Sequence, residues 1–111
     1  MPKNILVAGN LRITREDDSR GTVLRVFVSG GHHALKFDAF HRGAHWHSDP
    51  DGTNDIYAIN DSAPLLWTAN VIANKLGELL RAAGYEEAAA ELEHDPALRA
   101  RVENIGMALG I

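Results

Sequence analysis

The feature that most constrains this chain is a change of hydrophobic pattern near residue 60. Up to about Asn60, apolar residues alternate in short runs that Gly, Asp and Asn interrupt, which is typical of β-strands joined by tight turns. After Ser62 they recur every three or four positions, which is typical of amphipathic helices. A sheet with one apolar face and helices with one apolar stripe each can bury these apolar surfaces by packing against each other. We therefore predict an α+β fold with a strand half, residues 1–60, and a helical half, residues 61–111.

The strand half contains several short segments with strand character. Thr22–Val28 is apolar on both faces and is expected near the centre of the sheet. In the segment that ends at Phe40, Lys36 and Asp38 alternate with apolar residues and should point away from the core. The intervening turns are too short for crossover connections, so successive strands should pair antiparallel. We predict an N-terminal antiparallel β-meander of four to five strands, drawn from residues 5–8, 11–15, 22–28, 34–40 and 56–59.

The helical half should contain two to three helices packed on one face of the sheet. Ser62 is a candidate N-cap, and Pro64 suits the first turn of the helix that follows. An apolar stripe runs from Leu65 to Leu80, and Gly84 is placed to end this helix. A second helix is expected at about 85–93, and Asp95-Pro96 should start a third that extends to Leu109. With 111 residues, the chain suits one single α+β domain, residues 1–111.

Composition excludes several classes of site. The chain has no cysteine, which rules out disulfides, thiolate catalysis and cysteine-bound zinc or iron–sulfur centres. No apolar run has the length of a membrane helix. The apolar run near residue 1 is too short for a signal peptide, and only one basic residue precedes it. We therefore expect a cytoplasmic protein that does not associate with a membrane.

Charge is distributed unevenly along the chain. The net charge is −4, but residues 1–47 carry +3 and residues 48–111 carry −7. Such polarity can orient a protein partner or a polyanion toward one side of the molecule. The overall negative charge disfavours tight binding of RNA, because affinity for polyphosphates depends on Lys and Arg.

The chemically unusual segment is rich in histidine. Of six histidines, five lie between positions 32 and 47: His32, His33, His41, His45 and His47. In an extended chain, His45 and His47 point to the same face and could bind one metal ion. If the strand runs straight, His41, Asp49 and Asp51 lie on the same face and are candidate further ligands. Two histidines and one carboxylate would hold a divalent Zn, Mn, Ni or Fe ion and leave coordination positions open.

A metal-free site is an alternative. His45 and His47 could act as general acid and general base, with Asp38 or Asp49 orienting a ring. Arg42 would then neutralise a phosphate or a developing oxyanion. A third alternative is that the histidines have no chemical role, since exposed strands and turns collect histidines. Gly43 leaves the local path of the chain unpredictable, so the sequence does not show whether these side chains converge.

The segment also resembles a known family. The run Leu35-Lys36-Phe37-Asp38, the run Arg42-Gly43-Ala44-His45-Trp46-His47 and the following Tyr57 are similar to TumE-type toxins of bacterial toxin–antitoxin systems. The resemblance covers about residues 11–60. The chain departs from that pattern at Arg42, where Lys is usual, and at Ala44, where Asp is common. The resemblance implies a toxin that acts on RNA inside the cell and has an antitoxin partner.

Two functional hypotheses follow. The first is a histidine-centred site on the sheet that carries out acid–base or metal-assisted phosphodiester hydrolysis, with RNA as one substrate. The second is a non-catalytic accessory subunit or binding module, which docks on a larger protein or forms a homo-oligomer. In the second hypothesis the histidines are incidental.

Overall fold

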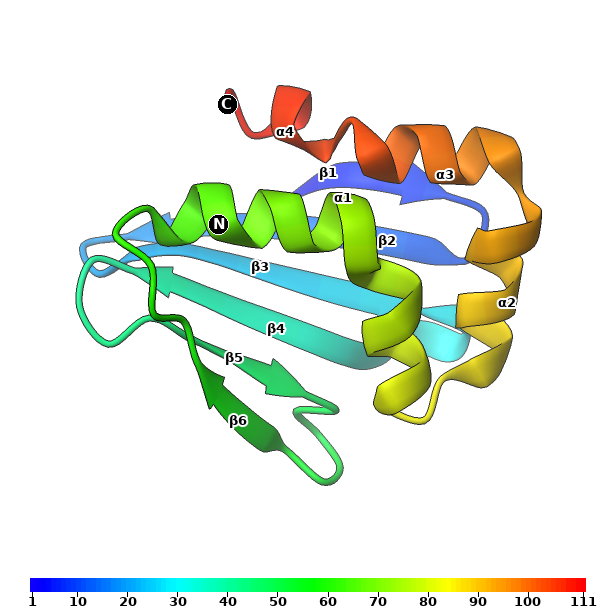
Figure 1. The fold of residues 1–111 in the computed structure, drawn as a ribbon, viewed down its shortest axis with the longest axis horizontal. Helices are drawn as coiled ribbons and strands as arrows, with labels where there is room; N and C mark the ends of the chain where they lie inside the picture. Colours follow the sequence, from blue (N-terminus) through cyan, green and yellow to red (C-terminus); the bar gives the residue numbers. More distant parts are fainter.

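The chain forms one antiparallel sheet with its helices on one face (Figure 1). The computed structural model describes all residues, 1–111. The six strands follow chain order across the sheet, and each pairs antiparallel with the next. This confirms the predicted α+β meander, with one strand more than expected. The strands are β1 Lys3–Ala8, β2 Leu11–Asp18, β3 Gly21–Val28, β4 His32–Phe40, β5 His45–Ser48 and β6 Asp55–Ala58; a 3-10 turn, Ser29–Gly31, links β3 to β4.

The helical half contains one long helix and three shorter ones. They are α1 Pro64–Ala82, α2 Glu86–His94, α3 Pro96–Glu103 and α4 Ile105–Ala108. Asp95 caps α3 as predicted, because its Oδ1 accepts hydrogen bonds from the backbone N–H groups of Ala97 and Leu98. The predicted Ser62 cap is wrong: Ala63 is the N-cap residue of α1, and no side chain caps it. The third predicted helix is broken at Asn104, where the backbone leaves the helical region.

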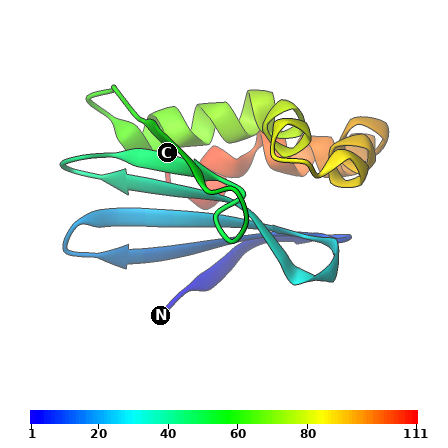
Figure 2. The ribbon, with the colours of Figure 1, turned by 90° about the horizontal axis from the view of Figure 1, so that it is seen from below.

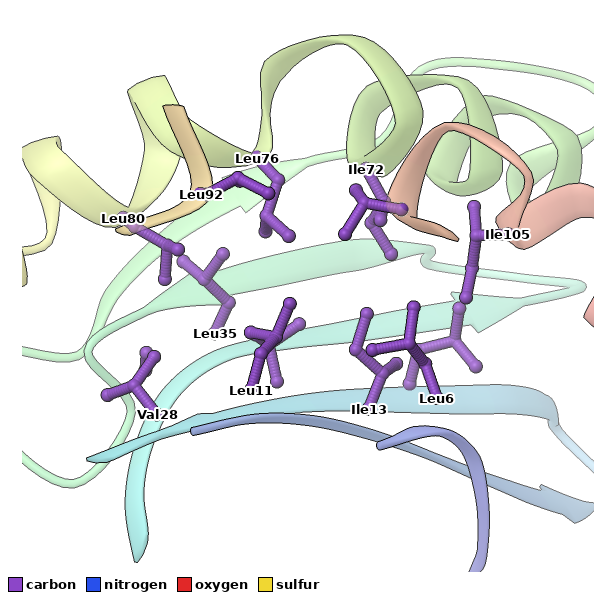
Figure 3. Packing of buried hydrophobic residues seen from close by; sticks show 14 of the residues in the cluster. Leu6, Leu11, Ile13, Val28, Leu35, Ile72, Leu76, Leu80, Leu92 and Ile105 are labelled. Carbon is purple, nitrogen blue, oxygen red and sulfur yellow. The ribbon is translucent and has the colours of Figure 1, made fainter. Parts of the chain in front are cut away.

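The core lies between the sheet and the helices. Nineteen buried apolar residues form one cluster, which joins side chains of β1–β4 to those of all four helices (Figure 3). Leu35 and Phe37 of β4 have no exposed surface and face this core. Lys36 and Asp38 alternate with them and therefore point to the opposite face of the sheet. Figure 2 shows that all helices lie on one side of the sheet, so the face that carries Lys36 and Asp38 is not covered by a helix.

The β5–β6 hairpin extends the sheet beyond the helices (Figure 1). The sequence did not predict β5 as a separate strand, although it is the strand that carries His45 and His47. Trp46 stacks on Phe37 with ring centroids 5.8 Å apart and on Tyr57 at 4.6 Å. Because Trp46 packs against the core, the two histidines point to the helix-free face. None of the helices is both long enough and apolar enough to span a lipid bilayer.

Candidate functional site

Asp38, His45 and His47 meet on the helix-free face of the sheet. The register between β4 and β5 places Asp38 directly opposite His45. His45 Nε2 lies 2.8 Å from Asp38 Oδ2, and His47 Nε2 forms a hydrogen bond of 2.9 Å with the same oxygen. The Asp38 side chain is 2% exposed, although no helix covers this face. One buried carboxylate oxygen is therefore shared by two imidazole rings.

The other nitrogen of each ring is also bonded to a protein oxygen. His45 Nδ1 lies 2.7 Å from the carbonyl oxygen of Gly43, and His47 Nδ1 lies 2.8 Å from Asn54 Oδ1. Carbonyl and amide oxygens can only accept, so both Nδ1 atoms are the donors. Gly43 has a φ of 67°, in the region that glycine enters without steric cost. This backbone conformation brings the chain from β4 back into β5 with the carbonyl oxygen beside His45.

Since Nδ1 carries the proton of each neutral ring, each Nε2 would direct its lone pair at a carboxylate oxygen. This contact is favourable only if a cation occupies the space between nitrogen and oxygen. Two additional protons would satisfy it, and two imidazolium rings with one carboxylate carry one net positive charge. Two neutral rings, one carboxylate and one divalent metal ion carry the same net charge. One ligand atom from each of the three residues lies within 4.8 Å of the other two, so the cluster can hold either form.

The β5–β6 turn supports the cluster from one side. The backbone oxygen of Asp49 accepts hydrogen bonds from the N–H groups of Gly52 (3.0 Å) and Asn54 (2.8 Å). Asp49 Oδ2 accepts a third from Thr53 N–H, at 3.1 Å, and Oδ1 accepts one from the hydroxyl of Tyr85, at 2.8 Å. Asp49 therefore organises the turn that brings Asn54 to His47. Tyr85, just before α2, ties this turn to the helical half.

The remaining predicted site residues lie outside the cluster. His41 is exposed in the bend after β4, and its contact with the rest of the chain is a backbone hydrogen bond to Arg20. Arg42 is exposed in the same bend, and its side chain forms no hydrogen bond or ion pair. Asp49 is committed to the β5–β6 turn and to Tyr85. Asp51 lies beside His33, with Oδ2 3.8 Å from its Nδ1. Of the residues proposed from sequence, the structure brings together Asp38, His45 and His47 and leaves His41, Arg42, Asp49 and Asp51 apart from them.

Three neighbours of the cluster were not assigned a role from sequence. Lys36 Nζ lies 3.7 Å from Asp38 Oδ1, an oxygen that has no hydrogen-bond donor. Asn54 binds His47, and the rings of Phe40 and His45 are nearly perpendicular, with centroids 5.8 Å apart. The alternation of β4 had already placed Lys36 on the face of Asp38, and that signal could have identified it. Nothing in the sequence marks Asn54, because its role depends on the geometry of the turn.

The model of one protein family, described as a domain of unknown function (DUF7700), matches residues 4–108. The matched region runs from the second residue of β1 to the end of α4 and so contains the sheet, the helices and the whole cluster. No curated protein and no solved structure matches the chain. The chemistry of the cluster is therefore the basis for inferring a function.

The link between Tyr85 and Asp49 gives a pH-dependent prediction. Tyr85→Phe removes only the hydroxyl, so we expect the free energy of unfolding to fall by about 1 kcal/mol or less at neutral pH. The hydrogen bonds from Tyr85 and Thr53 lower the pKa of Asp49, so this stabilisation is lost as the pH falls below about 4. Burial and the bond to Asp49 raise the pKa of Tyr85 to about 12, so it is also lost as the pH rises from about 10 toward 12.

Urea denaturation of wild type and variant at several pH values measures this difference. Tyr57→Phe is the matched control, because Tyr57 is 48% exposed and its hydroxyl has no hydrogen-bond partner. The prediction fails if the difference between wild type and Tyr85→Phe is the same at acid, neutral and alkaline pH.

Proposed function

The chain belongs to the DUF7700 family, and we propose that in this protein Asp38, His45 and His47 bind one divalent metal ion that serves the hydrolysis of a phosphodiester. The observation that carries the proposal is the environment of the two histidines. Each of their four ring nitrogens lies within 2.9 Å of a protein oxygen. Both Nδ1 atoms donate to fixed acceptors, and both Nε2 atoms point to the same carboxylate.

This arrangement favours a metal ion over a metal-free acid–base pair. A general base needs a ring nitrogen that faces the substrate or a water molecule, and neither histidine offers one. A metal-binding histidine, by contrast, usually donates its second N–H to a carbonyl or carboxylate oxygen, which fixes the ring and the tautomer. Gly43 and Asn54 provide these acceptors for His45 and His47.

The donor set fits a first-row divalent ion. Zinc binds imidazole nitrogen and carboxylate oxygen at about 2.0–2.2 Å, so neighbouring ligand atoms in a tetrahedral site lie about 3.3 Å apart. The Nε2–Oδ2 separations of 2.8 and 2.9 Å would widen by about half an ångström, a movement within the reach of small side-chain rotations. Two nitrogens and one oxygen also suit manganese, nickel or iron, and three protein ligands leave positions open for substrate and water.

The surroundings support an anionic ester as substrate. A bound metal ion would lower the pKa of a coordinated water and polarise a phosphoryl oxygen. Lys36, 3.7 Å from Asp38 Oδ1, adds a positive charge where negative charge develops in the transition state. RNA belongs to this substrate class, and the resemblance of residues 11–60 to TumE-type toxins is consistent with it.

Metal binding tests the ligand set directly. We expect the wild-type protein to bind Zn²⁺, measured by competition with a chromophoric chelator, and His45→Ala, His47→Ala and Asp38→Asn each to abolish or severely weaken binding. His41→Ala is the matched control: this histidine lies four positions before His45 but outside the cluster, so affinity should change less than about twofold. Circular dichroism confirms that each variant is folded. A wild-type protein that binds none of Zn²⁺, Mn²⁺, Ni²⁺ or Fe²⁺ would overturn the proposal.

The hydrogen bond between His47 Nδ1 and Asn54 Oδ1 predicts a smaller loss of metal affinity. Asn54→Ala removes the acceptor of Nδ1 but none of the ligands, so we expect Zn²⁺ affinity to fall by about 10–100-fold. Asn70→Ala is the control, because Asn70 is exposed on α1, away from the sheet. Equal affinities for Asn54→Ala and wild type would show that Asn54 does not orient His47.

Hydrolysis is tested with bis(4-nitrophenyl) phosphate and with a short single-stranded RNA. We expect activity in the presence of Zn²⁺ or Mn²⁺, loss of activity on chelation, and loss in His47→Ala but not in His41→Ala. Expression of the wild-type protein, but not of His47→Ala, should also slow bacterial growth if RNA is the substrate. Metal binding without turnover of either diester would retain the metal site and reject the hydrolase assignment.

A second candidate function is that of a binding module. β6 is the edge strand of the sheet, and two large apolar side chains on it are exposed: Ile56 is 57% and Tyr57 is 48% exposed. An exposed apolar edge strand can add a strand from another chain. A partner that co-purifies with wild type and His47→Ala alike, and is lost when Ile56 is replaced by Lys, would favour this function.

A further inference from the structure

We propose that Arg25 and Lys36 form a binding subsite for a phosphodiester anion beside the Asp38–His45–His47 cluster. This inference rests on the proposed function and names the residues that would hold its substrate. Arg25 of β3, Lys36 of β4 and His47 of β5 are direct cross-strand neighbours in register. They form a continuous row of basic residues on the face of the sheet that the helices leave uncovered (Figure 2).

This row has an electrostatic cost in the absence of a ligand. Side chains directly opposite one another on neighbouring strands lie about 5 Å apart at Cβ, and like charges at such positions destabilise the sheet. Two carboxylates offset the cost only in part. Glu16 Oε2 lies 3.3 Å from Arg25 Nη1, whereas the nearest carboxylate oxygen to Lys36 Nζ is Asp38 Oδ1, at 3.7 Å, beyond a hydrogen bond.

The net charge of this face would become more positive if the cluster held the proposed metal ion. One divalent ion with two neutral histidines and the Asp38 carboxylate would carry one net positive charge. Arg25 and Glu16 cancel, and Lys36 adds a second positive charge. With the metal ion bound, two net positive charges would lie on adjacent strands, a field that favours an anionic ligand.

A histidine also lies near this row. His33 stacks on Phe27, with ring centroids 4.9 Å apart, and its Nδ1 lies 3.8 Å from Asp51 Oδ2. Burial is the main cause that lowers the pKa of His33; the Asp51 carboxylate raises it, and the positive charges of Arg25, Lys36 and His47 lower it.

Accessibility and chemistry point to the same ligand. The side chains of Arg25 and Lys36 are 30% and 27% exposed, so their charged groups can reach a ligand without unfolding any part of the sheet. A guanidinium can bind two phosphate oxygens, and an ammonium adds a strong point charge. A phosphodiester held by this pair would lie beside His47, the cross-strand neighbour of Lys36.

The test uses dimethyl phosphate as the probe, titrated into the full-length protein and followed by amide chemical shifts. We expect shifts centred on Arg25 and Lys36 and an affinity that falls by about tenfold in Lys36→Met, since a charge-assisted hydrogen bond is lost. Lys36→Arg should retain most of the affinity. Arg12→Met is the matched control: Arg12 lies on the same face and stacks on Phe27, but in a different cross-strand row, so its affinity should change less than about twofold.

Titrations with chelator and with Zn²⁺ separate this inference from the proposed function. Lys36-dependent binding of dimethyl phosphate in chelator, in a protein that binds no metal, would retain the subsite and reject the metal site. No binding in either condition, or equal binding by wild type and Lys36→Met, would overturn the subsite whatever the metal affinity. A single-stranded RNA and vesicles of anionic phospholipid then identify the source of the diester: competition with dimethyl phosphate is expected from the RNA, and competition from the vesicles alone would reject a nucleic-acid substrate.

Discussion

The site depends on the pairing register of β4 and β5. Asp38 faces His45 and Lys36 faces His47 because these strands pair with Phe37 opposite Trp46. A slip of one residue would turn both histidines toward the helices. Trp46 opposes such a slip, since it stacks between Phe37 and Tyr57 on the side of the sheet that packs against the core. The tryptophan between the two histidines therefore contributes to the site indirectly, because its packing sets the direction in which they point.

A buried carboxylate on an uncovered sheet face is the second unusual feature. Asp38 is 2% exposed, and side chains of the site, not a helix, shield it from water. One of its oxygens is shared by two rings and the other has no hydrogen-bond donor. A buried carboxylate is costly unless it is paired with a positive charge or binds a metal ion. A cation held between Oδ2 and the two rings would compensate the charge of Asp38, and this is the physical reason to assign the residues a chemical role.

Much of the fold could be predicted from the sequence, and much less of the site. Alternation in β4 and the helical stripe of α1 depend on burial, which leaves a pattern in hydrophobicity. That pattern correctly placed Lys36 and Asp38 on one face, and the spacing of His45 and His47 correctly placed the two rings together. Parity along the chain also suggested His41 and Asp49 as ligands, but the bend at Gly43 and the left-handed backbone of Asp49 (φ 50°) interrupt the extended path that parity assumes. Asn54 could not be found, because hydrogen bonds within a turn leave no period in the sequence.

The helical half contributes to the site although none of its residues belongs to the cluster. Tyr85 holds Asp49, Asp49 organises the turn, and the turn presents Asn54 to His47. Each step is a hydrogen bond to a residue whose backbone is already constrained: Asp49 and Asn54 both have a φ of 50°. This series of hydrogen bonds restricts the rotation of the His47 ring more than one contact could. Asn54, the acceptor of His47 Nδ1, is itself held in place through Asp49 by Tyr85 on the helical side of the sheet. Without Tyr85 the turn would lose the contact that ties it to the helical half. The family model matches both halves, the sheet that carries Asp38, His45 and His47 and the helices that hold the turn beside them.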